Sequence, residues 1–229
     1  MAEIWNGLVE AFRLIFTFDP EVMSIAGLSL EIALSSVVIG SIIALPLASL
    51  IHFNNFRGKH ILVSVIQTFY SIPTVTVGLL VFVLFSHSGP LGGLDLLFTP
   101  TVMVIGQVIL VMPILLGMTI SALSGVDRNI IDTARSMGAN SWQTMLVVLK
   151  EARFAVIAAV VLAFGRAISE VGLAMMVGGN IRGFTRVLTT AISLETSKGD
   201  WELSMALGII LIFIALVINI IMNRIQQRR

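Results

Sequence analysis

The chain has 229 residues, of which 57% are hydrophobic and only 12% are charged, and its mean hydropathy is +1.01. This composition is too apolar for a soluble domain and predicts an integral membrane protein. A formal net charge of +1 gives no reason to expect a nucleic-acid partner, and the lack of cysteine excludes disulfides, thiolate metal sites and cysteine catalysis.

Residues 1–20 read as an N-terminal amphipathic segment rather than a signal peptide. Glu3 and Glu10 stand where a signal peptide carries basic residues, and no small-residue cleavage site follows them. Apolar residues recur at helical spacing over residues 4–16, with polar side chains on the other side. We therefore predict a helix that lies in the membrane interface, with Trp5 at headgroup depth.

Five segments are apolar over the length that a bilayer requires, which is about 20 residues per helix. They cover about residues 26–51, 61–86, 100–123, 155–179 and 202–223. The first three contain Pro46, Pro73 and Pro113, and packed membrane helices tolerate proline where neighbours satisfy the freed carbonyl. We interpret Pro46 and Pro113 as kinks. The predicted fold is all-α and polytopic, with five transmembrane helices in one membrane domain over residues 21–224 and a tail at 225–229.

The loop charges predict an orientation, because loops on the cytoplasmic side of a membrane carry an excess of Lys and Arg. Loop 52–60, loop 124–154 and the C-terminal residues 224–229 lie on one side of the five spans and hold nine of the 14 basic residues. Loop 87–99 lies on the other side and holds none. We therefore predict that the N-terminus faces outside and the C-terminus faces the cytoplasm.

Loop 180–200 fits this orientation imperfectly, because three of its residues are basic and lie outside. Its stretch 187–192 reads as a short helix that dips into the outer surface. Arg182 and Arg186 are expected to face outward, where an acidic binding protein and lipid headgroups are equal candidates as partners.

The segment 127–153 is a polar stretch in an apolar chain, and it reads as two short helices. Asp127 can cap the first helix, and Ser141 can cap the second. Gly138 lies near the end of the first helix, where a left-handed residue is easily placed. Ala134 and Gly138 are four residues apart and share a face, so small side chains there leave a surface that another protein could approach. An Asp and an Arg that lie three positions apart in the first helix can pair or contact a partner.

The spacing in this segment resembles the cytoplasmic EAA-x3-G-x9-I-x-L-P motif of bacterial and archaeal ABC importer permeases. The chain has Asp-Thr-Ala at 132–134, then three residues and Gly138, then nine residues and Val-Leu at 148–149. It departs from the motif in the first two residues and at 150–151, where Lys-Glu replaces Leu-Pro. The small third residue and the glycine are kept at the spacing of the motif.

Further stretches resemble the oxyanion permeases for molybdate, tungstate and sulfate. Residues 71–78 read SIPTVTVG, and residues 89–92 read GPLG. Residues 164–172, FGRAISEVG, and residues 175–180, MMVGGN, resemble tungstate permeases most, whereas molybdate relatives have a Gly-Glu-Phe-Gly run there. The resemblance covers about residues 20–225.

This resemblance implies a type I ABC importer permease fold, with the permease domain over 21–224 and a coupling segment at 127–153. It implies a homodimer in the inner membrane, surrounded by lipid, with two separate ATPase subunits and an external oxyanion-binding protein. The chain is expected to be no enzyme and to hold no cofactor, since ATP and Mg belong to the ATPase and no G-x-x-x-x-G-K-[ST] motif occurs. The residues expected at the ATPase contact are Asp132, Ala134, Arg135, Gly138 and Ala139.

Arg166 and Glu170 lie within the fourth predicted span, four residues apart and hence on one helical face. A charge in the bilayer is costly unless it is paired or hydrated, so both should face the bundle interior or an aqueous path. Two interpretations stay open for these residues and Ser169. Either Arg166 lies near the pathway of a dianion, or the pair is structural or closes a gate. We favour the pair or gate, because an importer should not bind its substrate tightly in mid-path.

Two other classes of function compete with this interpretation. An ion-coupled secondary transporter often shows an internal repeat and several buried carboxylates, and the five predicted spans show no obvious repeat. An intramembrane enzyme would need G-x-S-x-G, H-E-x-x-H or paired acids at metal spacing, and the sequence contains none of them. We therefore expect the permease subunit of an ABC importer for an oxyanion, tungstate first, with molybdate and sulfate as alternatives.

Overall fold

A computed structural model describes residues 2–227, and every regular element in that range is a helix, which confirms the all-α prediction. The element order is α1 (Ala2–Phe16), α2 (Pro20–Phe53), α3 (Lys59–Thr68), η1 (Phe69–Ser71), α4 (Thr74–Phe85), η2 (Gly92–Leu94), α5 (Pro100–Ser124), α6 (Arg128–Ser136), α7 (Ser141–Glu151), α8 (Arg153–Ile168), α9 (Gly172–Gly178), α10 (Leu188–Lys198) and α11 (Trp201–Gln227). α11 extends into the predicted tail 225–229, whose Arg228 and Arg229 lie outside the described residues.

Three described helices, α2, α5 and α11, are long and apolar enough to cross a membrane as single helices. Two further segments are bent pairs, with an angle of 97° between α3–η1 and α4 and of 58° between α8 and α9. The described chain therefore has five candidate spans if each bent pair is one span. Each of the predicted spans 61–86 and 155–179 is therefore interrupted by a break between its two helices.

The prolines of the predicted spans differ in what they do to the chain. α2 continues through Pro46 and α5 continues through Pro113. Pro73, in contrast, stands at the 97° bend directly before α4, and its carbonyl accepts from the amides of Thr76 and Val77 at 3.0 and 3.3 Å. Proline suits a helix start, because the ring presets φ and the missing N–H has no helical partner there.

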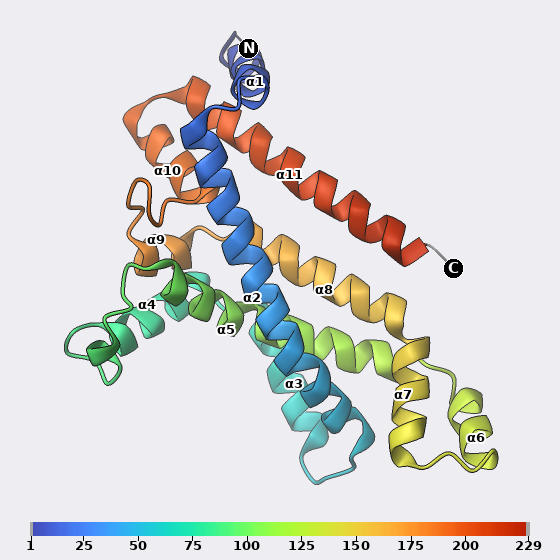
Figure 1. Ribbon diagram of the computed structural model, residues 1–229. Coiled ribbons are helices and arrows are strands. Elements are labelled where there is room, and N and C mark those ends of the chain that lie inside the picture. Colours follow the sequence, from blue (N-terminus) through green and yellow to red (C-terminus); the bar gives the residue numbers. More distant parts are fainter. Residues whose placement is uncertain (1, 228–229) are drawn as a thin grey trace.

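The predicted amphipathic helix over residues 4–16 is confirmed as α1, which lies beside the start of α11 (Figure 1). Ala11 and Leu14 are buried in a cluster with residues of α2, α10 and α11. Trp5 and Phe16 are exposed. α1 thus packs on the bundle with one face and leaves an apolar face uncovered, as a helix at a membrane interface requires.

The centre of the bundle is formed by α2, α5 and α8, whose buried residues meet in one cluster. This cluster includes Ala33 and Val37 of α2, Val111 and Leu115 of α5, and Ala163 of α8. Small side chains on α2 and α8 let these helices approach closely, which is the usual basis of packing between membrane helices. The Arg166 turn of α8 is thereby held against a rigid core.

The short helices beyond the two breaks, α4 and α9, pack against each other. At Gly78 of α4, an added Cβ would lie 3.1 Å from the Cα of Leu173 in α9. At Gly172 of α9, an added Cβ would lie 3.0 Å from the side chains of both Thr74 and Val75 in α4. The two bent segments therefore contact each other next to their breaks, through glycines that no side chain could replace without displacement.

The two ends of the molecule carry different elements. α6, α7 and the turn between α2 and α3 lie toward one end, whereas α1, α10 and the η2 loop lie toward the other (Figure 1). The basic loops 52–60 and 124–154, which were predicted to share a side, therefore lie at the same end.

The substitution Gly78→Val tests the packing of α4 on α9. A valine side chain overpacks against the Leu173 backbone, so the free energy of unfolding should fall by roughly 1–3 kcal/mol. Gly208→Val in α11 is the matched control, because nothing lies within 4 Å of an added Cβ there. The measurement is the unfolding midpoint of the purified protein in detergent. Equal midpoints for the two variants would contradict the close approach of α4 and α9.

Candidate functional site

The first candidate site is the polar segment 127–153, which forms the two predicted short helices α6 and α7. The Asp127 carboxylate accepts from the Asn129 amide at 2.9 Å and caps α6, as predicted. Gly138 has φ +85°, and the amide of Ala139 reaches back to the carbonyl of Ala134 at 3.0 Å. This is the closure that a left-handed glycine permits, and it confirms the predicted end of α6.

The cap of α7 differs from the prediction by one residue. Asn140, rather than Ser141, accepts from the Gln143 amide at 2.9 Å, while the Gln143 side chain accepts from the Asn140 amide at 2.8 Å. This reciprocal capping box satisfies two free amides at once, which a serine one position later cannot do. Both helices of the segment are therefore closed at the turn that joins them.

A shallow apolar groove of about 490 Å³ lies between α6 and α7. Its lining includes Ile130, Thr133, Ala134, Met137, Ala139 and Val147. Met137 is 84% exposed, so the rim of the groove carries a large apolar side chain in the open. Of the predicted contact residues, only Ala134 and Ala139 belong to this lining.

The remaining predicted contact residues lie outside the groove. Nothing lies within 4 Å of a Cβ added at Gly138, so this turn is open to an approaching partner. Asp132 and Arg135 are exposed, and neither forms an ion pair with another described residue. Their charges are thus left for contacts outside the chain.

The second candidate site is the charged pair at the break between α8 and α9. Arg166 Nη1 donates to Glu170 Oε2 at 2.8 Å, so the predicted ion pair is present. The other oxygen, Glu170 Oε1, accepts from the Leu173 amide at 2.9 Å in the first turn of α9. The Glu170 side chain is 2% exposed, whereas that of Arg166 is 30% exposed. Glu170 therefore faces the protein, and Arg166 reaches an open surface.

A break in a membrane helix frees backbone carbonyls that need hydrogen-bond donors from the protein. At this break, neighbouring side chains donate to the freed carbonyls. Thr189 Oγ1 donates to the Glu170 carbonyl at 2.7 Å, and Gln107 Nε2 donates to the Ala167 carbonyl at 3.3 Å. The Ser169 hydroxyl donates to the Gly165 carbonyl at 2.8 Å. The Ser169 hydrogen is thus engaged with the backbone, and its oxygen offers only lone pairs to other groups.

The open surface beside Arg166 is a groove of about 580 Å³ between η1, α5, α8 and α11. Its polar lining consists of Arg166, Ser169, Tyr70 and Asn219. Sequence reasoning missed Tyr70 and Asn219. The signal for Asn219 was available, because it is the one polar residue between Gly208 and Met222 of a strongly apolar helix. Tyr70 carried no such signal, since its place in this groove depends on packing against helices that are distant in sequence.

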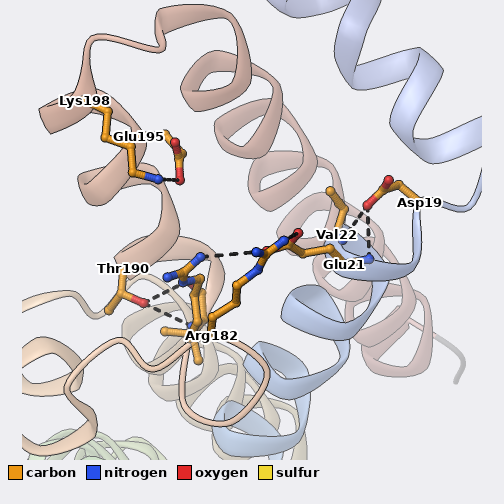
Figure 2. A network of polar contacts seen from close by, with 9 residues as sticks. Asp19, Glu21, Val22, Arg182, Thr190, Glu195 and Lys198 are labelled. Carbon is orange, nitrogen blue, oxygen red and sulfur yellow. Dashed lines mark hydrogen bonds and ion pairs between the residues drawn. The ribbon is translucent and has the colours of Figure 1, made fainter.

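A separate set of charges lies at the other end of the molecule, where the α9–α10 loop meets α2 (Figure 2). Arg182 donates to both carboxylate oxygens of Glu21, with 2.7 Å from Nε to Oε1, and this bond raises the pKa of its guanidinium. Arg186 Nη1 lies 3.8 Å from the same carboxylate, and its side chain is only 15% exposed. Arg186 is therefore held against the protein near Glu21, whereas the Arg182 side chain is 73% exposed.

The helix predicted over 187–192 is confirmed as α10, and it extends to Lys198. Lys198 pairs with Glu195 at 2.8 Å within this helix, as Figure 2 shows. Groups of three or more His, Cys, Asp or Glu side chains that could hold a metal do not occur in the described range.

Comparisons with known proteins agree with this architecture. The family of binding-protein-dependent transport system inner membrane components matches residues 36–229. The chain is 38% identical to the tungstate uptake system permease protein TupB of Peptoclostridium acidaminophilum, over 99% of this chain and 100% of that protein. It is 41% identical to a probable anion ABC transporter permease protein of Haloferax volcanii, over 90% of this chain and 91% of that protein.

A solved structure shares the fold. One chain of a bacterial alginate ABC transporter, in complex with an alginate pentasaccharide-bound periplasmic protein, superposes with a TM-score of 0.75. The likeness covers 97% of this chain and 86% of that chain at 20% sequence identity. At this identity the likeness concerns the fold alone.

Paired substitutions test the role of the Arg166–Glu170 pair. Glu170→Met leaves Arg166 without its partner, and breaking such a pair should cost about 3 kcal/mol of unfolding free energy. The double variant Arg166→Met with Glu170→Met removes both charges and should cost less than Glu170→Met alone. The unfolding midpoints in detergent are measured for Glu170→Met, for Arg166→Met and for the double variant. A double variant as unstable as the sum of the two single variants would show that the pair is not coupled.

Proposed function

The chain belongs to the family of binding-protein-dependent transport system inner membrane components, and we propose that it carries an oxyanion, tungstate first, through the membrane in an ATP-driven importer. The family makes the chain a multi-pass membrane permease subunit. The observation that carries the substrate is the identity of 38% with a tungstate uptake permease over nearly the full length of both proteins. Molybdate and sulfate remain the alternatives within the same class.

The α6–α7 surface is the part of the chain that we assign to an ATPase subunit. An ATPase on a separate subunit needs a firm contact surface. The end of α6 is closed by a backbone hydrogen bond and the start of α7 by a side-chain capping box, beside an apolar groove. The lining residues Ala134 and Ala139 would receive a side chain of the ATPase, with Asp132, Arg135 and Gly138 around them. ATP and Mg then bind on that subunit and not on this chain.

The movement of α7 has a route into the membrane helices. Val148 of α7 is 0% exposed and packs in one cluster with Leu123 at the end of α5 and Ala152 before α8. A displacement of α7 is therefore transmitted to α5 and α8, because a close-packed cluster moves as a unit. α8 in turn carries Arg166 and the break at Glu170, so the docking surface and the polar groove lie on one mechanical path.

Orientation and assembly follow from this assignment. ATP is cytoplasmic, so the end with α6 and α7 lies in the cytoplasm, together with the basic loop 52–60 and the C-terminus. The N-terminus, α1, α10 and the η2 loop then face outside, where an oxyanion-binding protein delivers the substrate. The alginate transporter that shares the fold is in complex with a periplasmic protein, which supports such a partner. We further propose a homodimer of this chain with two ATPase subunits.

Transport by the purified complex tests the proposed function. The permease, reconstituted in vesicles with its ATPase and its binding protein, should accumulate tungstate only with ATP and should stop with vanadate. Sulfate should be taken up more slowly than tungstate, while molybdate, with nearly the same size and charge, should compete. Uptake that persists without the ATPase would instead indicate an ion-coupled secondary transporter, and preferred uptake of sulfate would overturn the substrate.

The substitution Ala134→Trp tests the docking surface. A tryptophan fills the groove between α6 and α7, so binding of the ATPase subunit and coupled transport should each fall about tenfold or more. Ser136→Trp is the matched control, because Ser136 is exposed on the same helix and does not line the groove. Pull-down of the ATPase by the membrane-inserted permease measures the first quantity. Normal ATPase binding by Ala134→Trp would move the interface elsewhere.

A further inference from the structure

The groove beside Arg166 collects polar side chains from three separate elements in an otherwise apolar setting. Tyr70 comes from η1, Arg166 from α8 and Asn219 from α11, and their neighbours in the lining include Ile114 and Leu162. Polar groups in an apolar environment are costly unless they are hydrogen-bonded, so residues of this kind within membrane helices mark sites of function or contact.

The hydrogen-bonding capacity of these side chains is largely unused. A guanidinium has five N–H donors, and Glu170 takes one of those of Arg166. Among the side chains and backbone groups that the structure describes, which leave out the side chains of residues 2–4, 223 and 225–227, none is hydrogen-bonded to the Tyr70 hydroxyl or the Asn219 side-chain amide. The groove thus presents three groups that can donate to a ligand.

Acceptors of full negative charge are kept out of the groove. Both carboxylate oxygens of Glu170 are occupied, one by Arg166 and the other by the Leu173 amide, and the side chain is buried. The lining contains no Asp or Glu. Glu170 therefore holds the guanidinium in place from behind and does not compete with an anion in the groove.

The Tyr70 hydroxyl lies directly against α5 at Gly117, where the lack of a side chain leaves room for it. A Cβ added at Gly117 would lie 1.8 Å from this hydroxyl oxygen and 2.6 Å from the ring carbon that carries it. The ring also packs beside Ile66 and Leu116. The position of the hydroxyl at the edge of the groove is thus set by packing.

We propose that Tyr70, Arg166 and Asn219 form a transit site that contacts the oxyanion inside the membrane, with Glu170 as a positioning residue. This inference rests on the proposed function, because its ligand is the transported anion. A tetrahedral dianion accepts hydrogen bonds and donates none, which matches a guanidinium with two neutral donors. The ion pair with Glu170 reduces the net charge of the site, so the anion is bound weakly enough to leave.

The test compares Tyr70→Phe and Asn219→Leu with Thr119→Val in reconstituted vesicles that contain the ATPase and the binding protein. Thr119 is a matched control, because its buried hydroxyl also lacks a partner in the described chain but does not line the groove. Each groove variant should lower the rate of tungstate uptake about tenfold, the effect of one hydrogen bond to a charged group. The number of ATP molecules hydrolysed per tungstate imported should rise. Thr119→Val should leave both values unchanged.

Three other outcomes would overturn the proposal. Normal uptake by both groove variants would show that the anion does not contact these side chains. Loss of uptake together with loss of the dimer, measured by light scattering, would show that Tyr70 and Asn219 bond to a second copy instead. If the unmodified complex takes up no tungstate, the proposed function itself is overturned, and the transit site with it.

Discussion

A break in a membrane helix exposes backbone groups that the bilayer cannot hydrate, and the Glu170 carboxylate resolves this problem between α8 and α9. One of its oxygens accepts from the Leu173 amide at the start of α9, and the other binds Arg166 at the end of α8. Thr189 and Gln107 satisfy the carbonyls around the same break. One buried carboxylate therefore allows the bend of 58° and fixes the guanidinium that faces the polar groove.

The two bent segments depend on each other. α4 follows the bend at Pro73 and α9 follows the bend at Glu170, and the two short helices meet through Gly78 and Gly172. Tyr70 and Arg166 lie just before these two bends, and both line the groove that Asn219 of α11 also lines. The polar groove lies beside these breaks, whereas the proposed docking surface on α6 and α7 is a separate unit that reaches the bundle through Val148.

The sequence patterns predicted those features well that depend only on residues close to one another in the chain. The amphipathic spacing of residues 4–16, the cap at Asp127 and the left-handed Gly138 are confirmed, because each depends on residues within about one helical turn. The cap of α7 was placed one residue too late, since the capping box needs both Asn140 and Gln143. The pairing of Arg186 with Glu21 was not predicted, because Glu21 is distant in sequence.

The amino-acid sequence was sufficient to predict the all-α membrane class, the apolar segments, the polar segment 127–153 and the pairing of Arg166 with Glu170. These features follow from composition, helical periodicity and the spacing of four residues, which act over short stretches of chain. The packing of the helices was needed to show that Glu170 faces inward and Arg166 outward, and that Tyr70 and Asn219 share a groove with Arg166. These relations join helices that are distant in sequence, and close packing rather than local preference brings them together.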